Sequence, residues 1–160
     1  MMGRALLIIG LMATLGLITT ATLGYLLEGP ADERLRFHVL LALATSLLLL
    51  FAHCWIMFYL IGTGRAIKDA VKEYGLDPAV IEDTKRFKNQ SYPMLMLALG
   101  LAMATFILGG AAATGSLNWL HHALFYATLA AQVRALQLEW RVLTENQRLM
   151  TEINRRLAAA

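Results

Sequence analysis

Histidine is the residue type that could carry chemistry in this chain, and every histidine falls within a long apolar stretch. The four are His38, His53, His121 and His122. An imidazole among lipid-facing helices is costly, whereas the charged segments of the chain could hold one freely and hold none. This distribution indicates that the rings have a role inside the apolar part of the protein.

Two of these positions have matching places in the chain. His38 begins the second apolar stretch, and the pair His121 and His122 begins the fourth. If successive helices alternate in direction, the second and fourth run the same way, so these rings should lie at comparable depth. Because His121 and His122 are ~100° apart on a helix, only one of them can face His38, and the sequence leaves open which.

Two imidazoles facing each other across a four-helix bundle are suited to axial ligation of haem b. A copper or zinc site would need a third ligand. We favour haem because glycine and alanine faces on the first and third helices would give the porphyrin clearance. Arg34 and Arg36, just before His38, could pair with its propionates. The alternative for His38, His121 and His122 is an interfacial residue without a ligand.

His53 is harder to interpret. It lies 15 residues after His38, on roughly the same face and ~22 Å further along the helix, as an inner haem ligand would. The fourth helix, however, has Ala135 and Leu136 where the partner histidine should be. The remaining candidate ligands are the methionines Met57, Met94 and Met96. The favoured alternative is a buried ring hydrogen-bonded to a neighbouring helix.

The composition excludes several classes of function. The chain is 58% hydrophobic and 16% charged, against about 45–50% and about 25% in soluble domains, which indicates an integral membrane protein. One cysteine, Cys54, allows neither an internal disulfide nor a thiolate metal cluster. The phosphate-binding loop, the His-Glu-x-x-His pair, Cys-x-x-Cys and Gly-x-Ser-x-Gly are missing from the sequence. A stand-alone enzyme or a nucleic-acid-binding protein is therefore not expected.

Hydrophobic patterning predicts an all-α integral membrane four-helix bundle that forms a single domain. The predicted membrane spans are residues 5–27, 37–62, 91–112 and 117–138, with a helical hairpin at 63–90 and a helical tail at 139–158. Gly75 and the Asp77-Pro78 pair predict the hairpin turn. Pro93 either begins a new helix or kinks a continuous one. No internal repeat is evident.

The positive charges predict the topology. Twelve Lys and Arg residues fall on one side of the predicted membrane and two on the other. We therefore expect a multi-pass protein of a bacterial inner membrane, with both termini and the hairpin in the cytoplasm. The first apolar run has 23 residues, longer than the ~7–15 of a signal-peptide core, so we expect a retained helix.

These features lead to three hypotheses of function. The first is a small haem b subunit for electron transfer or membrane anchoring in a larger redox complex, with a quinone as a further cofactor. The second is a cofactor-free scaffold or homo-oligomer that binds partner subunits through 63–90 and 139–158. Its coiled-coil seam would be Leu136, Trp140, Leu143, Gln147, Met150, Asn154 and Leu157. The third is an ion or proton channel that uses Arg134, Gln132 and His53.

Overall fold

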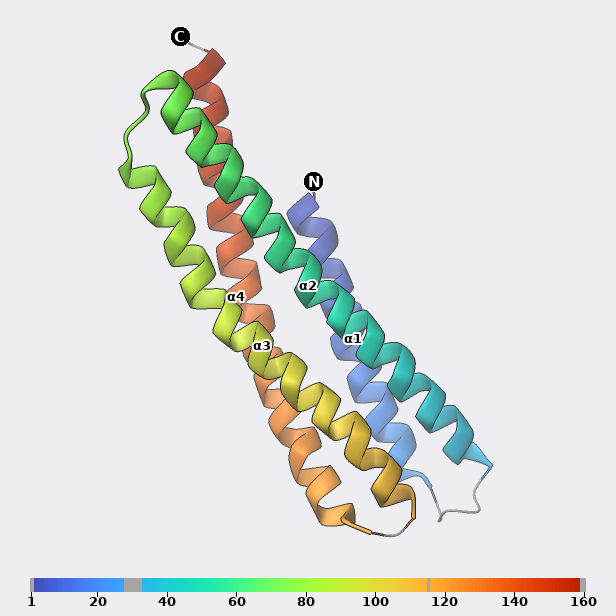
Figure 1. The fold of residues 1–160 in the computed structure, drawn as a ribbon. Helices are drawn as coiled ribbons and strands as arrows, with labels where there is room; N and C mark the ends of the chain where they lie inside the picture. The colour runs from blue at the N-terminus through green and yellow to red at the C-terminus, as the bar shows by residue number, and fades with distance from the viewer. Residues whose placement is uncertain (1, 28–32, 115, 159–160) are drawn as a thin grey trace.

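The computed structural model describes residues 2–27, 33–114 and 116–158, and these form four α-helices with no strand (Figure 1). The helices are α1 (Met2–Tyr25), α2 (Arg34–Tyr74), α3 (Ala79–Ala113) and α4 (Asn118–Ala158). The predicted all-α class and number of helices are confirmed for this part of the chain. Residues 28–30, which follow the predicted end of the first span, lie outside the described residues.

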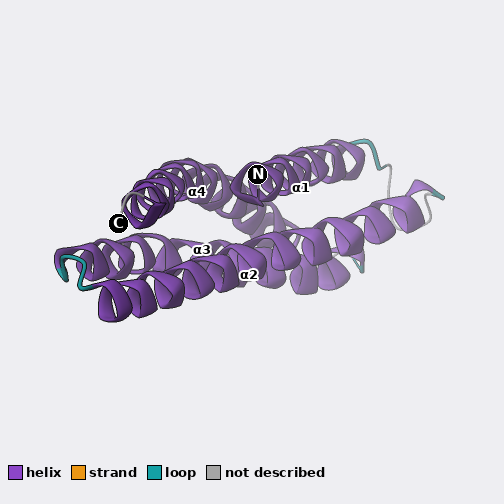
Figure 2. Cartoon of the chain, turned by 90° about the horizontal axis from the view of Figure 1, so that it is seen from above, coloured by secondary structure: helices purple, strands orange, loops and turns teal. Residues whose placement is uncertain are grey.

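The four helices form an elongated bundle whose neighbours in sequence pack as antiparallel pairs. α1 packs on α2, α2 on α3, α3 on α4 and α4 on α1, while α2 and α4 also meet across the diagonal. Figure 2 shows α1 and α4 in one layer and α2 and α3 in the other. This arrangement allows side chains of α2 and α4 to meet in the centre of the bundle.

α2, α3 and α4 extend beyond the start of α1 and form a three-helix extension (Figure 1). Its core contains the buried side chains Ile67, Val71 and Ile153. The predicted hairpin and tail are therefore direct continuations of the bundle helices. α3 also runs without a break through Pro93, which settles the alternative left open by the sequence.

The α2–α3 turn is built as the sequence predicts. Gly75 follows the last residue of α2 in the left-handed conformation, with φ of 64°. The side-chain Oδ1 of Asp77 accepts a hydrogen bond from the backbone N–H of Ala79 at 2.9 Å. Together these two residues end one helix and start the next.

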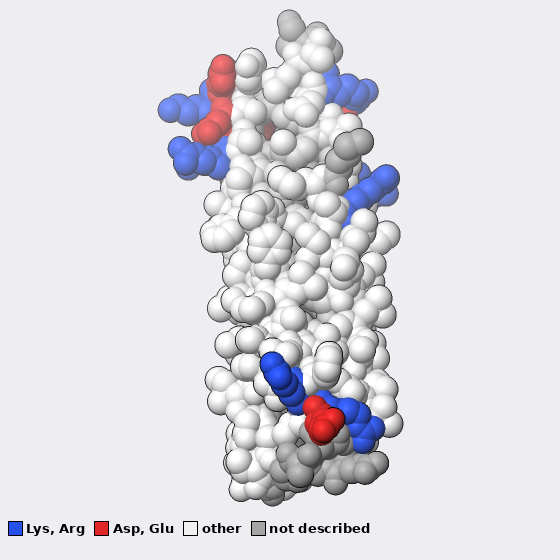
Figure 3. Space-filling model, turned by 90° about the vertical axis from the view of Figure 1, so that its right-hand side faces the viewer, with Lys and Arg blue, Asp and Glu red and all other residues white. Residues whose placement is uncertain are grey.

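Three of the helices formed by the described residues, α1, α2 and α3, are long and apolar enough to cross a membrane, and α4 is not among them. Only 28% of each apolar window is buried inside the bundle, and large apolar side chains such as Phe58 and Ile107 point outward. Figure 3 shows Lys, Arg, Asp and Glu gathered towards the two ends of one face, with an uncharged band between them. An apolar outer surface of this extent suits a lipid environment.

The interior face of the α4 tail differs from the seam predicted for a coiled coil. The buried residues of this segment are Glu139, Val142, Leu143, Asn146 and Ile153. Of the predicted seam only Leu143 is buried, and Trp140 is 62% exposed. The tail therefore uses a neighbouring face to pack within its own chain, and a coiled coil between chains through the predicted seam remains a prediction.

We expect Gly75→Ala to destabilise the protein by about 1–2 kcal/mol, because a residue with a Cβ is strained at this positive φ. Gly62→Ala is the matched control, since Gly62 is helical and exposed, and a Cβ there meets nothing within 4 Å. That control should stabilise by about 0.5–1 kcal/mol. Denaturant unfolding in mild detergent measures both, and equal effects of the two substitutions would contradict the assigned turn.

Candidate functional site

A cavity of ≈ 550 Å³ lies near the α1–α2 and α3–α4 connections, which we call the histidine end of the bundle. His38, His121 and His122 all line it. This placement agrees with the expectation that the three rings lie at comparable depth. The cavity also falls within the ~300–1,000 Å³ range typical of small-molecule sites.

His38 is held by the neighbouring helix of its own hairpin. Its Nδ1 lies 3.0 Å from the carbonyl oxygen of Thr20 on α1. A carbonyl oxygen can only accept, so Nδ1 carries the hydrogen and Nε2 of the neutral ring keeps a lone pair. A Cβ at Gly24 would lie 2.8 Å from Cε1 of the ring, so glycine is needed for the ring to pack this closely.

His121 is held in the same way by α3. Its Nδ1 lies 3.0 Å from the carbonyl oxygen of Thr105, and a Cβ at Gly109 would lie 3.2 Å from Cε1 of the ring. By the same argument Nδ1 donates, and Nε2 of the neutral ring is free to act as a ligand. Both rings thus have the nitrogen roles that a metal-bound histidine requires.

The two hairpins share one pattern, which the sequence analysis missed. The first helix of each carries Thr-x-x-x-Gly, and the second carries a histidine followed seven residues later by threonine. In each hairpin the threonine of the second helix lies against the threonine of the first. The hydroxyl oxygens are 3.5 Å apart for Thr20 and Thr45, and 2.8 Å apart for Thr105 and Thr128. α1–α2 and α3–α4 are therefore similar hairpins, each of which presents one histidine to the cavity.

His122 has a different environment from its neighbour. Its ring stacks on Tyr25 of α1, with centroids 5.1 Å apart and planes 12° apart. His121, rather than His122, is thus the counterpart of His38. Arg34 and Arg36 have exposed side chains in the first turn of α2, and neither lines the cavity, so their pairing with propionates remains a prediction.

His53 lies in a second polar cluster, away from the cavity. Its Nδ1 is 2.6 Å from Oε1 of Glu139, its Nε2 is 2.9 Å from Oε1 of Gln132, and all three side chains are fully buried. Nε2 of Gln132 donates to Oγ1 of Thr14 at 3.1 Å. Both nitrogens of His53 are thus occupied, which agrees with the hydrogen-bonded interpretation and leaves neither for an inner haem.

Glu139 is the functional candidate that the sequence analysis missed, because it was assigned to the tail. Gln132, Glu139 and Asn146 recur every seven residues on the buried face of α4, and this spacing could have identified the row. Arg134, placed with Gln132 and His53 in the channel hypothesis, is instead exposed and donates to Gln137.

The other metal-site alternatives gain no support from the described residues. No group of three or more His, Cys, Asp or Glu side chains that could hold a metal ion occurs among them, so the copper or zinc site lacks its third ligand. Met57 and Met94 pack against the apolar core, and Met96 is 57% exposed. These methionines thus behave as packing or surface residues.

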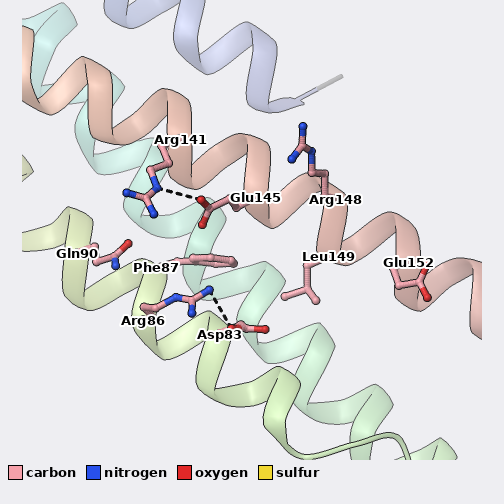
Figure 4. Close-up of a pocket in the computed structure, with 9 residues that line it drawn as sticks. All are labelled: Asp83, Arg86, Phe87, Gln90, Arg141, Glu145, Arg148, Leu149 and Glu152. Carbon is pink, nitrogen blue, oxygen red and sulfur yellow. Dashed lines mark hydrogen bonds and ion pairs between the residues drawn. The ribbon is translucent and has the colours of Figure 1, made fainter.

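A shallow groove between α3 and α4 lies at the other end of the bundle (Figure 4). Four of its charged residues form ion pairs within the groove: Arg141 with Glu145 and Arg86 with Asp83, each at 3.0 Å. The side chain of Phe87 lies between these pairs in Figure 4 and is 3% exposed. These ion pairs leave the groove without an evident preference for ligands of either charge.

No family model matches the chain, and comparison with curated proteins and with solved structures finds no significant match. The assignment of function therefore rests on the geometry of the two polar sites.

We expect His53→Leu to destabilise the protein by about 3–5 kcal/mol, because it leaves the Glu139 carboxyl group buried without its partner. His122→Leu, which removes a half-buried ring stacked on Tyr25, should cost only about 1 kcal/mol. Denaturant unfolding in detergent compares the two. Equal losses of unfolding free energy in the two variants would show that the His53–Glu139 contact stabilises the protein no more than the ring stack does.

Proposed function

We propose that this chain is a membrane-embedded haem b subunit that transfers electrons or anchors a larger redox complex, with His38 and His121 as the two haem ligands. The observation that carries the proposal is the equivalent fixation of these two rings. Each donates Nδ1–H to a threonine carbonyl of the preceding helix, and each lines the same cavity from opposite members of the α2–α4 pair.

The protein's own residues would bind and orient the cofactor. The bonds to Thr20 and Thr105 fix the tautomer and the plane of each imidazole and increase the basicity of Nε2. Gly24 and Gly109 allow close packing of the rings against α1 and α3. A haem held by two imidazoles supplies one-electron transfer at a potential that its surroundings tune.

The membrane setting is part of the proposal. Three helices have the length and hydropathy of membrane spans, and α4 completes the bundle with Gln132, Glu139 and Asn146 turned inward. The excess of Lys and Arg at the three-helix extension favours the cytoplasm for that end. The cavity would then face the outer leaflet, where a quinol is a suitable electron donor, and the extension would be available to partner subunits.

The protein purified in detergent, after expression with adequate haem supply, should give a reduced-minus-oxidised haem b spectrum. His38→Ala and His121→Ala should each reduce the haem content at least tenfold, because each removes one iron ligand. His122→Ala is the matched control, since it removes the adjacent ring that stacks on Tyr25, and it should retain the spectrum. Absence of haem from the wild type would contradict the proposal and favour the cofactor-free subunit. Haem retained by the double variant, which carries both His38→Ala and His121→Ala, would contradict the assigned ligands.

A further inference from the structure

The second polar cluster, formed by His53, Glu139, Gln132 and Thr14, has hydrogen bonds whose direction can be worked out. The side chains of His53, Glu139 and Gln132 are fully buried. Glu139 is the one buried acidic or basic residue among those described, and His53 is the one fully buried histidine. Any proton held here is therefore held without nearby bulk water.

The direction of these hydrogen bonds follows from the contact between Thr14 and Gly10, in which only one atom can donate. The hydroxyl of Thr14 donates to the carbonyl oxygen of Gly10 at 2.9 Å, because that oxygen can only accept. Oγ1 of Thr14 must then accept from Nε2 of Gln132 at 3.1 Å. Oε1 of Gln132 consequently faces Nε2 of His53, and this nitrogen must carry a hydrogen.

The remaining contact must then contain a shared proton. Nδ1 of His53 and Oε1 of Glu139 are 2.6 Å apart, which is too close for two acceptors without a hydrogen between them. Whether this proton resides on nitrogen or on oxygen, the pair has no net charge, which is the least costly state for a buried site. Removing this proton would leave a buried carboxylate facing the lone pair of Nδ1, and that state is costly.

The other carboxyl oxygen is where a second proton could bind. Oε2 of Glu139 is buried and has no hydrogen-bond partner among the described residues. It faces α1 at Gly10, where a Cβ would lie 3.4 Å away. A proton on Oε2 would give imidazolium beside a neutral carboxylic acid, and both ring N–H groups would keep their acceptors. Because the pair then carries a net charge of +1, this second proton binds only on acidification.

We propose that His53 and Glu139 form a proton-binding site that always holds one shared proton and reversibly binds a second at Oε2 of Glu139. The site is separate from the haem cavity and does not depend on a cofactor.

The charged side chains nearest to the site along α1 and α4 are exposed. On α4, Glu139 is only two residues, ~3 Å of helix rise, from the exposed Arg141. On α1 the charged residue is Arg4, which is exposed, and on α3 the hydroxyl of Tyr92 donates to the carbonyl of Met57. On α2 the neighbour is Cys54, which is half-buried. No other buried charge competes for the proton among the described residues.

Infrared difference spectra between neutral and acidic pH test uptake of the second proton. The wild type should gain a carbonyl band of a protonated carboxylic acid that differs from those of solvent-exposed acids. Glu139→Gln should lack this band. Glu145→Gln, a matched change on the same helix at an exposed ion pair with Arg141, should retain it. An identical spectrum from Glu139→Gln would overturn the proposal.

Nitrogen-15 NMR of the histidines tests the first proton and needs no change at the pair itself. The variant His38→Ala with His121→Ala and His122→Ala leaves His53 as the sole histidine. Its Nε2 should carry a hydrogen over the whole pH range in which the protein is folded, and the Nδ1 signal should move on acidification together with the infrared band. A deprotonated Nε2 at neutral pH would overturn the proposal, whether or not the wild type binds haem.

Discussion

A polar side chain inside this bundle is costly unless a neighbouring helix supplies a hydrogen-bond partner, and this constraint determines where the histidines lie. His38 bonds to the backbone of α1, His121 to the backbone of α3, and His53 to side chains of α4. Each bond also fixes the state of one ring nitrogen. Packing and chemistry are thus determined by the same contacts.

The two polar sites differ because the hairpins are similar at one end only. Near the connections both hairpins repeat the same threonine, glycine and histidine pattern, which gives two equivalent rings around one cavity. Further along, α4 has Gln132 and Glu139 where the corresponding residues of α2 are Leu49 and Ile56. The second site therefore forms once, across the α2–α4 diagonal, around His53.

Much of the fold could be predicted from the sequence, since apolar runs and turn residues mark the helices and Gly75 marks a chain reversal. The common depth of His38 and His121 followed from alternating helix direction. The choice between His121 and His122 did not, because it depends on how α4 is rotated against α3 and α1. Glu139 was missed because its charge resembles that of the exposed tail, and only the contact with His53 shows that it faces inward.

The central claim is that Nε2 of His38 and Nε2 of His121 are presented to one haem iron. Electron paramagnetic resonance of the oxidised, haem-supplied protein tests this most directly, because it reports the number and strength of the axial ligands. If both rings bind the iron, the wild type gives a low-spin ferric signal that is lost or becomes high-spin in His121→Ala. A high-spin signal in the wild type, or the same low-spin signal in His121→Ala, would contradict it.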